Sequence, residues 1–334
     1  MTRNNTEKTE IMAQENIWIG FDLGGTKMLA VVFDDQFQVM GTSRKKTKGH
    51  EGAKSGMARV NATIAAAMVE ANVKPDQISG LGIGCPGPLD LKQGVIREAP
   101  NLGWVNVPIA NSISGEFGFP VRVGNDVDFG VFGEYHFGAA RGARCAVGIF
   151  PGTGIGGGCV YEGKLIQGAN STCMEIGHIP LPSSTALHGD GRWTSLEACA
   201  SRLAISGEAA QAAFRGQAEH LLEIAGTDIS KIRSAQLADS IRAGDEAIRD
   251  IVERAARVMS LGVVTLVHLL APDIVILGGG LVEAMPDLYL ESVTKTANKQ
   301  VLPSFRNSFR IAPAELGDQA TAMGAAAAAK QTFS

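Results

Sequence analysis

Two short apolar segments joined only by a glycine turn constrain the fold of this chain most. The stretch IWIGFDLGGTKMLAVVFD (17–34) runs through Gly24, Gly25, Thr26 and Lys27 straight into a second β-branched segment. So short a connection predicts an antiparallel hairpin. Dinucleotide-binding folds and Walker loops need strand, glycine loop and then helix, and G-x-x-x-x-G-K-[ST] does not occur in the sequence. The hairpin therefore argues against both of those nucleotide folds.

The same arrangement recurs in CAVGIFPGTGIGGGCVYEGKL (145–165), where Gly152, Thr153 and Gly154 form the turn. A repeated unit predicts two related lobes. Around the two hairpins we expect helices over 57–72, 195–217, 234–270 and near the C-terminus, and strands over 78–84, 121–126 and 273–277. No low-complexity linker separates the halves. The pattern indicates an α/β protein whose lobes pack around a cleft.

Composition limits the partners of the chain. Its 334 residues exceed one typical core, and the net charge of -4 with 19% charged residues describes a soluble globular protein without a strong basic field. We therefore expect no nucleic-acid partner. The only basic run, Arg44 to Lys48, is interpreted as the solvated end of a hairpin.

The cysteines and the apolar segments favour a cytoplasmic protein. Five cysteines without a C-x-x-C pair suit a reducing compartment. Residues 1–16 are polar and lack the apolar run of a signal peptide, so we expect a loose tail. The most apolar region, 258–280, is interrupted by His268, Pro272 and Asp273, which predicts a buried helix followed by a buried strand. No membrane contact is expected.

The glycine turns are candidate phosphate sites. A turn without side chains presents backbone N–H groups, and each of these two turns adds a threonine hydroxyl. Asp22, at the end of the first strand, can reach Mg²⁺ directly or through water, because this ion binds a few carboxylates and keeps several waters. Two such nests facing one another would hold a triphosphate. The alternative is a pair of ordinary glycine hairpins.

The motifs DLGGTK, GIGCPGPLD, NLGW, GND, GTGIGGG, EIGH and ILGGG, in this order from Trp18 onward, resemble the ROK family of sugar kinases and sugar-responsive regulators. The resemblance implies an actin-like (ribonuclease H-like) duplicated two-lobe fold with ATP and Mg²⁺ in the central cleft. It implies an N-terminal lobe over 17–130, completed by a C-terminal helix (318–332), and a second lobe over 131–317. Gly278, Gly279 and Gly280 are then expected near the adenosine.

The same resemblance assigns a sugar site. Asp126 is the candidate general base for the attacking hydroxyl, although a helix cap is the alternative reading. Sugar contacts are expected from Gly87, Asn101, Asn125, Asp126, Glu175, His178 and Glu197. Family sequences usually continue Asn-Asp-Ala-Asn, whereas this chain has Val127 and Asp128 after Asp126. That departure bears on which sugar is preferred.

A second departure concerns zinc. ROK proteins commonly carry Cys-x-Cys-Gly-x-x-Gly-Cys-x-Glu, and the matching stretch here is HGDGRWTSLE (188–197), with His188, Asp190 and Ser195 in place of the cysteines. Serine is a poor zinc ligand, so no structural Zn²⁺ is expected. The remaining weak candidate set is His178, His188 and Asp190.

The resulting prediction is an ATP- and Mg²⁺-dependent hexose kinase, most simply a glucokinase acting on the primary hydroxyl of the sugar, as a homodimer or homotetramer. N-acetylmannosamine, N-acetylglucosamine, fructose and allose stay open as acceptors. A sugar sensor that does not bind DNA is the main alternative, because only about sixteen residues precede the first strand, too few for a helix-turn-helix module. An ATPase without a small acceptor is another. Polyphosphate could replace ATP, but no basic cluster near the cleft motifs is expected.

Overall fold

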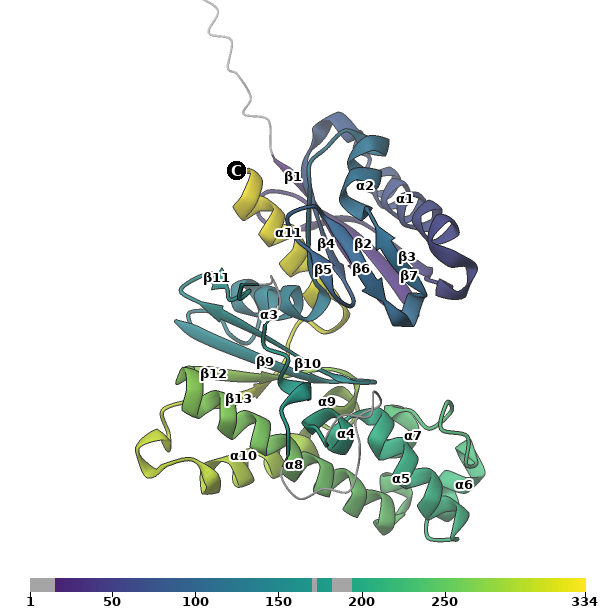
Figure 1. Ribbon diagram of the computed structural model, residues 1–334, viewed down its shortest axis with the longest axis vertical. Coiled ribbons are helices and arrows are strands. Elements are labelled where there is room, and N and C mark those ends of the chain that lie inside the picture. Colours follow the sequence, from purple (N-terminus) through teal and green to yellow (C-terminus); the bar gives the residue numbers. More distant parts are fainter. Residues whose placement is uncertain (1–15, 170–172, 182–193) are drawn as a thin grey trace, which may run out of the picture.

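The computed structural model describes residues 16–169, 173–181 and 194–334. The first sheet contains β1 (Ile17–Leu23), β2 (Lys27–Phe33), β3 (Val39–Lys46), β4 (Ile78–Cys85) and β8 (Val121–Asn125), in the order β3-β2-β1-β4-β8 (Figure 1). β1 and β2 are antiparallel, and β4 and β8 continue the sheet parallel to β1. The predicted first hairpin is confirmed.

The second sheet repeats this plan. It contains β9 (Cys145–Pro151), β10 (Ile155–Tyr161), β11 (Lys164–Leu165), β12 (Ile274–Leu277) and β13 (Arg310–Pro313), in the order β11-β10-β9-β12-β13. β9 and β10 form the antiparallel hairpin, and β12 and β13 are parallel to β9. Strand order and strand directions therefore match those of the first sheet, which confirms the predicted duplicated α/β architecture.

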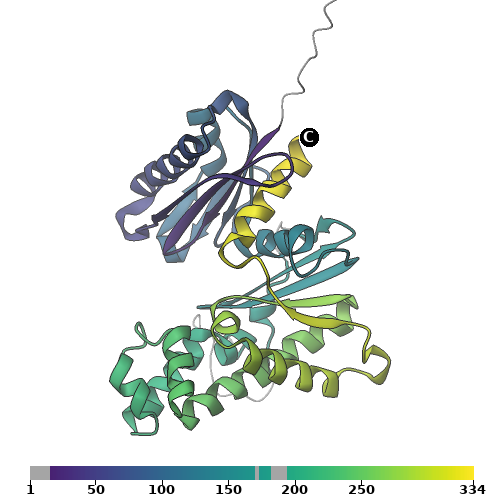
Figure 2. The same ribbon diagram turned by 180° about the vertical axis from the view of Figure 1, so that it is seen from behind.

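Helices cover the sheets from outside (Figures 1 and 2). α1 (Gly52–Glu70) and α2 (Ile109–Phe117) pack on the first sheet, beside a small sheet of β5 (Leu89–Asp90), β6 (Val95–Ala99) and β7 (Trp104–Val107). The second half carries α4 (Leu196–Ala200), α5 (Arg202–Phe214), α6 (Glu219–Ala225), α7 (Ser234–Ala243), α8 (Glu246–Leu270), α9 (Gly280–Ala284) and α10 (Pro286–Gln300).

Two of the predicted helices are each divided in two. The helix expected over 195–217 breaks at Ser201, whose extended backbone ends α4 and whose side chain accepts a hydrogen bond from the N–H of Ala204 at the start of α5. The helix expected over 234–270 breaks at Gly244, which adopts a left-handed conformation after α7. α1 begins at Gly52, earlier than the expected 57. Local capping chemistry therefore decides the breaks at Ser201 and Gly244.

The apolar region 258–280 folds as expected, into the end of a helix followed by a strand. α8 ends at Leu270, Ala271 turns the chain with a φ of 45°, and the fully buried β12 begins at Ile274. None of the helices in the described ranges has the length and apolar character needed to cross a membrane.

Two helices join the sheets. α3 (Asp126–Phe137) packs on β9 and β10, and α11 (Ala320–Phe333) packs on α3 and also on β1 and β4 (Figures 1 and 2). α11 is rich in alanine, and its alanines contribute to two core clusters, one on each side. At Gly324, a Cβ would lie 1.8 Å from the backbone oxygen of Phe129, so α3 and α11 approach as closely as glycine permits. The chain that leaves β8 is thereby held beside α11.

Candidate functional site: two cavities that meet at Asp126

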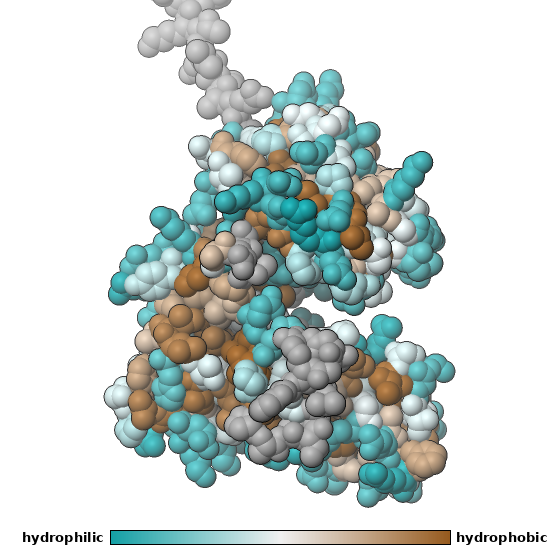
Figure 3. Space-filling view, in the orientation of Figure 1, coloured by the Kyte–Doolittle hydropathy of each residue, from teal (hydrophilic) through white to brown (hydrophobic). Residues whose placement is uncertain are grey.

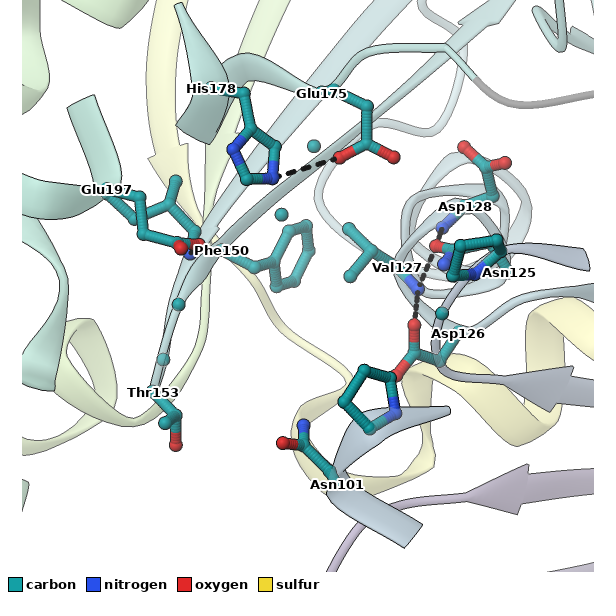
Figure 4. A pocket seen from close by; sticks show the side chains of 18 of the residues that line it. Asn101, Asn125, Asp126, Val127, Asp128, Phe150, Thr153, Glu175, His178 and Glu197 are labelled. Carbon is teal, nitrogen blue, oxygen red and sulfur yellow. Dashed lines mark hydrogen bonds and ion pairs between the residues drawn. The ribbon is translucent and has the colours of Figure 1, made fainter. Parts of the chain in front are cut away.

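A cavity of about 700 Å³ opens between the two halves of the molecule. In the space-filling view, the surface is notched between the half that carries the first sheet and the half below it (Figure 3). All the predicted sugar contacts line this cavity: Gly87, Asn101, Asn125, Asp126, Glu175, His178 and Glu197. They come from the small sheet and its loops, the start of α3, the 3₁₀ turn Ile176–His178 and α4 (Figure 4). Residues far apart in sequence therefore form one polar pocket.

A second cavity of about 250 Å³ adjoins the first. Asp22 and Gly24 of the first hairpin line it, together with Gly279, Glu283 and Asp318. Asp126, Val127 and Phe150 line both cavities. Asp126 therefore lies where the two cavities meet.

The predicted phosphate-binding residues are divided between the larger and the smaller cavity. Gly152, Thr153 and Gly154 line the larger cavity, whereas Asp22, Gly24 and Gly279 line the smaller one. The other predicted residues are neighbours in sequence of Gly24 and Gly279, which line the smaller cavity. Four of them are exposed, namely Gly25, Thr26, Lys27 and Gly280, and the fifth, Gly278, is buried. The two glycine turns thus belong to adjacent cavities.

The start of α3 orients Asp126. Asn125 is the N-cap, and its Oδ1 accepts hydrogen bonds from the N–H groups of Val127 (2.9 Å) and Asp128 (3.1 Å). The hydroxyl of Thr321, on α11, donates to the backbone oxygen of Asp126 at 3.1 Å. Because Asn125 caps the helix, the alternative reading of Asp126 as the cap is wrong. The carboxyl of Asp126 accepts a hydrogen bond from the N–H of Val127 at 3.0 Å.

Burial sets the protonation of two of the four carboxyl groups that line the smaller cavity among the described residues, Asp126 and Asp22. It raises the pKa of Asp126 to about 6, with Glu175 adding to the rise and the N–H of Val127 opposing it. Burial also raises the pKa of Asp22 to about 7, with the charge of Asp126 contributing and that of Lys27 opposing. A carboxyl group with a pKa near 6 is ionised at neutral pH yet basic enough to take a proton from a hydroxyl.

The second glycine turn packs closely against the carboxylate of Glu197. The Oε2 of Glu197 accepts a hydrogen bond from the N–H of Ile155 at 2.8 Å. A Cβ on Gly154 would lie 2.3 Å from that same oxygen, so only glycine lets the carboxylate approach the turn. Across the cavity, the Nε2 of His178 lies 3.9 Å from Oε2 of Glu175.

The structure corrects the interpretation of the basic run. Arg44 lies on β3 beside β2, and its Nη1 contacts Oδ2 of Asp318 at 3.0 Å, while Nζ of Lys27 contacts Oδ1 of the same carboxylate at 2.5 Å. Asp318 lines the smaller cavity. The side chain of Arg44 is 49% exposed, so this part of the run is solvated as expected. The expectation of no basic cluster near the cleft motifs is wrong, because strand pairing places Arg44 near the first glycine turn.

Two further residues of the site were not predicted from the sequence. Arg202, the first residue of α5, donates from Nη2 to the hydroxyl of Thr153 at 2.8 Å. Asp128, noted only as a departure from the family pattern, lines the larger cavity. Neither carries a local signal, since arginine after a serine cap and aspartate in a first helical turn are common surface residues.

The acidic lining of the smaller cavity fits Mg²⁺. This ion needs one or two carboxylates with waters and phosphate oxygens, and Asp22, with Asp126 close by, supplies carboxylates of that kind. For zinc, His188 and Asp190 lie outside the described residues. Within the described ranges, no group of three or more His, Cys, Asp or Glu side chains is arranged to hold a metal ion.

This chain is similar to known sugar kinases over nearly its whole length. The glucokinase of Thermotoga maritima is 30% identical over 314 residues, 94% of this chain and 97% of that protein. The crystal structure of a ROK family glucokinase from Streptomyces griseus, in complex with glucose and AMPPNP, superposes with a TM-score of 0.80 at 30% identity, covering 95% of this chain and 99% of that one. A xylose repressor of Caldicellulosiruptor bescii is 27% identical over 77% of this chain and 65% of that protein.

The fold shared with these kinases is the actin-like fold that the motifs implied. Its duplicated sheet order is the one described above. The model of the ROK family matches residues 18–332, so this chain belongs to the ROK family.

Proposed function

We propose that this protein is an ATP-dependent hexose kinase, most simply a glucokinase, which transfers the γ-phosphoryl group of ATP to the primary hydroxyl of the sugar. The observation that carries the proposal is the position of Asp126, a half-buried residue that lines both a large polar cavity and a smaller acidic one. Transfer between two substrates requires such a junction, because acceptor hydroxyl and γ-phosphorus must lie in line.

In this proposal, the larger cavity holds the sugar. Asn101, Asn125, Glu175, His178 and Glu197 offer the amide, imidazole and carboxylate groups that a ring of hydroxyls requires. Asp126 accepts the proton of the attacking hydroxyl as the oxygen–phosphorus bond forms and the bond to the leaving ADP breaks. Asp22 would hold Mg²⁺, which neutralises phosphate charge when bound. Lys27 and Arg44, beside Asp318, place positive charge at the same end.

The relatives support a sugar kinase. The Thermotoga maritima protein is a glucokinase, and the Streptomyces griseus structure contains glucose and AMPPNP, one ligand for each kind of cavity proposed here. The xylose repressor supports the sensor alternative. Sugar binding without turnover would favour that sensor, and a gel shift with genomic DNA fragments would detect a regulator that binds DNA. ATP hydrolysis without any sugar would favour an ATPase without a small acceptor.

We also propose a lobe organisation, a location and an assembly for this protein. The N-terminal lobe would span 17–130 with 318–332, and the second lobe 131–317. The protein would act in the cytoplasm as a homodimer or homotetramer without nucleic acid, and it would contain no structural Zn²⁺.

The test is ADP release with Mg²⁺ and ATP across glucose, mannose, fructose, allose, N-acetylglucosamine and N-acetylmannosamine. We expect strong turnover on glucose in the wild type. Asp126→Ala should lose at least about 100-fold in kcat, because it removes the base, while ATP binding is retained. Near-wild-type turnover in Asp126→Ala would remove Asp126 as the base. No turnover on any sugar, with ATP still bound, would favour a sensor and direct attention to residues 188–197.

A further inference from the structure

Asp128 is a buried carboxyl group that the mechanism above does not use. It lies in the first turn of α3 and is 3% exposed. Its backbone N–H is bonded to Asn125, but its Oδ1 is fully buried and has no hydrogen-bond partner in the described part of the chain. The side chain nevertheless lines the larger cavity (Figure 4). Oδ1 itself lies close to Gly158 of β10, where a Cβ would be 3.2 Å from it, so a ligand in the cavity meets the rest of the carboxyl group. Burying a carboxylate is destabilising unless an opposite charge or a donor compensates it, and a ligand can supply either.

The surroundings of Asp128 are acidic. Glu175 lies beside it at the cavity wall (Figure 4). Burial, with further contributions from Glu175 and Asp126, raises the pKa of Asp128 to about 7. The described residues that line the cavity include four carboxylates, Asp126, Asp128, Glu175 and Glu197, whereas lysine and arginine are absent from that lining. Arg202 bonds to Thr153 on the opposite wall, so the excess of negative charge lies on the side of Asp128 and Glu175.

This charge distribution distinguishes between classes of sugar. A neutral hydroxyl offers Asp128 one donor and no compensating charge. An ammonium group offers three N–H donors and a positive charge, and hydrogen bonds between charged groups are stronger than neutral ones. An acetylated nitrogen has lost both the charge and two of those donors.

We propose that the pocket accepts an amino sugar, a hexose with a free ammonium group, and that Asp128, with Glu175 beside it, binds that ammonium. This inference rests on the proposed function, because it names the acceptor class of the same site. Asp128 is then a specificity-determining residue, while Asp126 keeps its role as the base.

The test compares glucosamine with glucose at pH 7 and saturating ATP and Mg²⁺. The Asp128→Asn variant keeps the shape of the side chain and removes its charge. We expect it to lower the ratio of kcat/KM for glucosamine to kcat/KM for glucose by about tenfold or more. Asp250→Asn, an exposed position on α8 outside both cavities, is the matched control and should leave the ratio unchanged.

Calorimetry without nucleotide gives a second readout that does not depend on phosphoryl transfer. Glucosamine should bind the wild type more tightly than N-acetylglucosamine does, and Asp128→Asn should remove that difference. If both variants turn over glucose and glucosamine with the wild-type ratio, the inference is overturned while the kinase function stands. If no sugar is phosphorylated but glucosamine binding depends on Asp128, the kinase proposal fails and the amino-sugar site stands. Absence of both glucosamine binding and turnover would also overturn the inference.

Discussion

At the scale of single residues, the site depends on carboxyl groups removed from water. Asp126 has a pKa raised to about 6 by burial, with Glu175 contributing. As the proposed base it must be ionised, so kcat/KM should fall about tenfold per pH unit below about pH 6. A profile of kcat/KM from pH 5 to pH 8 with glucose at saturating ATP tests this. An acidic limb near pH 4, the value for an ordinary carboxyl, would contradict the assignment.

Asp128 should lower the stability of the ligand-free protein at neutral pH. Its pKa rises from 3.8 to about 7 on folding, so the native state binds the proton more tightly than the unfolded state. Native stability associated with this group is therefore complete below about pH 4 and is lost as the pH rises toward 7. We expect Asp128→Asn to be more stable than the wild type at pH 8, by at most about 4 kcal/mol, and equal to the wild type near pH 4.

Urea unfolding of the ligand-free variant and wild type at several pH values measures this difference. Asp250→Asn again serves as the control, because an exposed carboxyl undergoes little change in surroundings on folding. An Asp128→Asn protein that is less stable than the wild type at pH 8 would show that a donor already satisfies the carboxylate.

At the scale of secondary-structure elements, the contact of α3 with α11 determines where Asp126 lies. Gly324 faces the backbone oxygen of Phe129, and a Cβ would come within 1.8 Å of it. Gly324→Ala should therefore force the helices apart and cost about 2 kcal/mol or more, despite the better helix propensity of alanine. Through Thr321, which bonds to Asp126, kcat should fall as well.

Gly207→Ala on α5 is the matched control. It is the same substitution inside a helix, but nothing from outside the helix lies within 4 Å of the added Cβ, so stability should rise by up to about 1 kcal/mol. Thermal and urea unfolding of the two variants test the difference. If Gly324→Ala proved as stable as Gly207→Ala, the close packing of α3 on α11 would be refuted.

At the scale of the whole molecule, the larger cavity lies open between two halves. Asn101 lies on one side and Thr153 on the other (Figure 4). Because water competes with the sugar for the phosphoryl group, we expect sugar binding to close the halves. Small-angle X-ray scattering should show a smaller radius of gyration with saturating glucose than without it. Scattering curves that are identical with and without bound glucose would argue against closure.

The sequence by itself determined the local elements and the order of the motifs. Both hairpins could be predicted because two apolar β-branched segments around a glycine turn have one favourable pairing. The repeat of that unit indicated the duplication, and the motif series indicated the family. The residues of the sugar pocket, from Gly87 to Glu197, could be named only through that resemblance, since each one alone has an ordinary structural use.

Only the tertiary structure decided how distant groups meet. Strand pairing placed Arg44 beside Asp318, and the packing of α5 brought Arg202 to Thr153. Burial, which no local pattern encodes, raised the pKa of Asp126 and left Oδ1 of Asp128 without a donor among the described residues. The physical reason is that propensity and turn chemistry act between neighbours in the chain, whereas desolvation and charge act between neighbours in space.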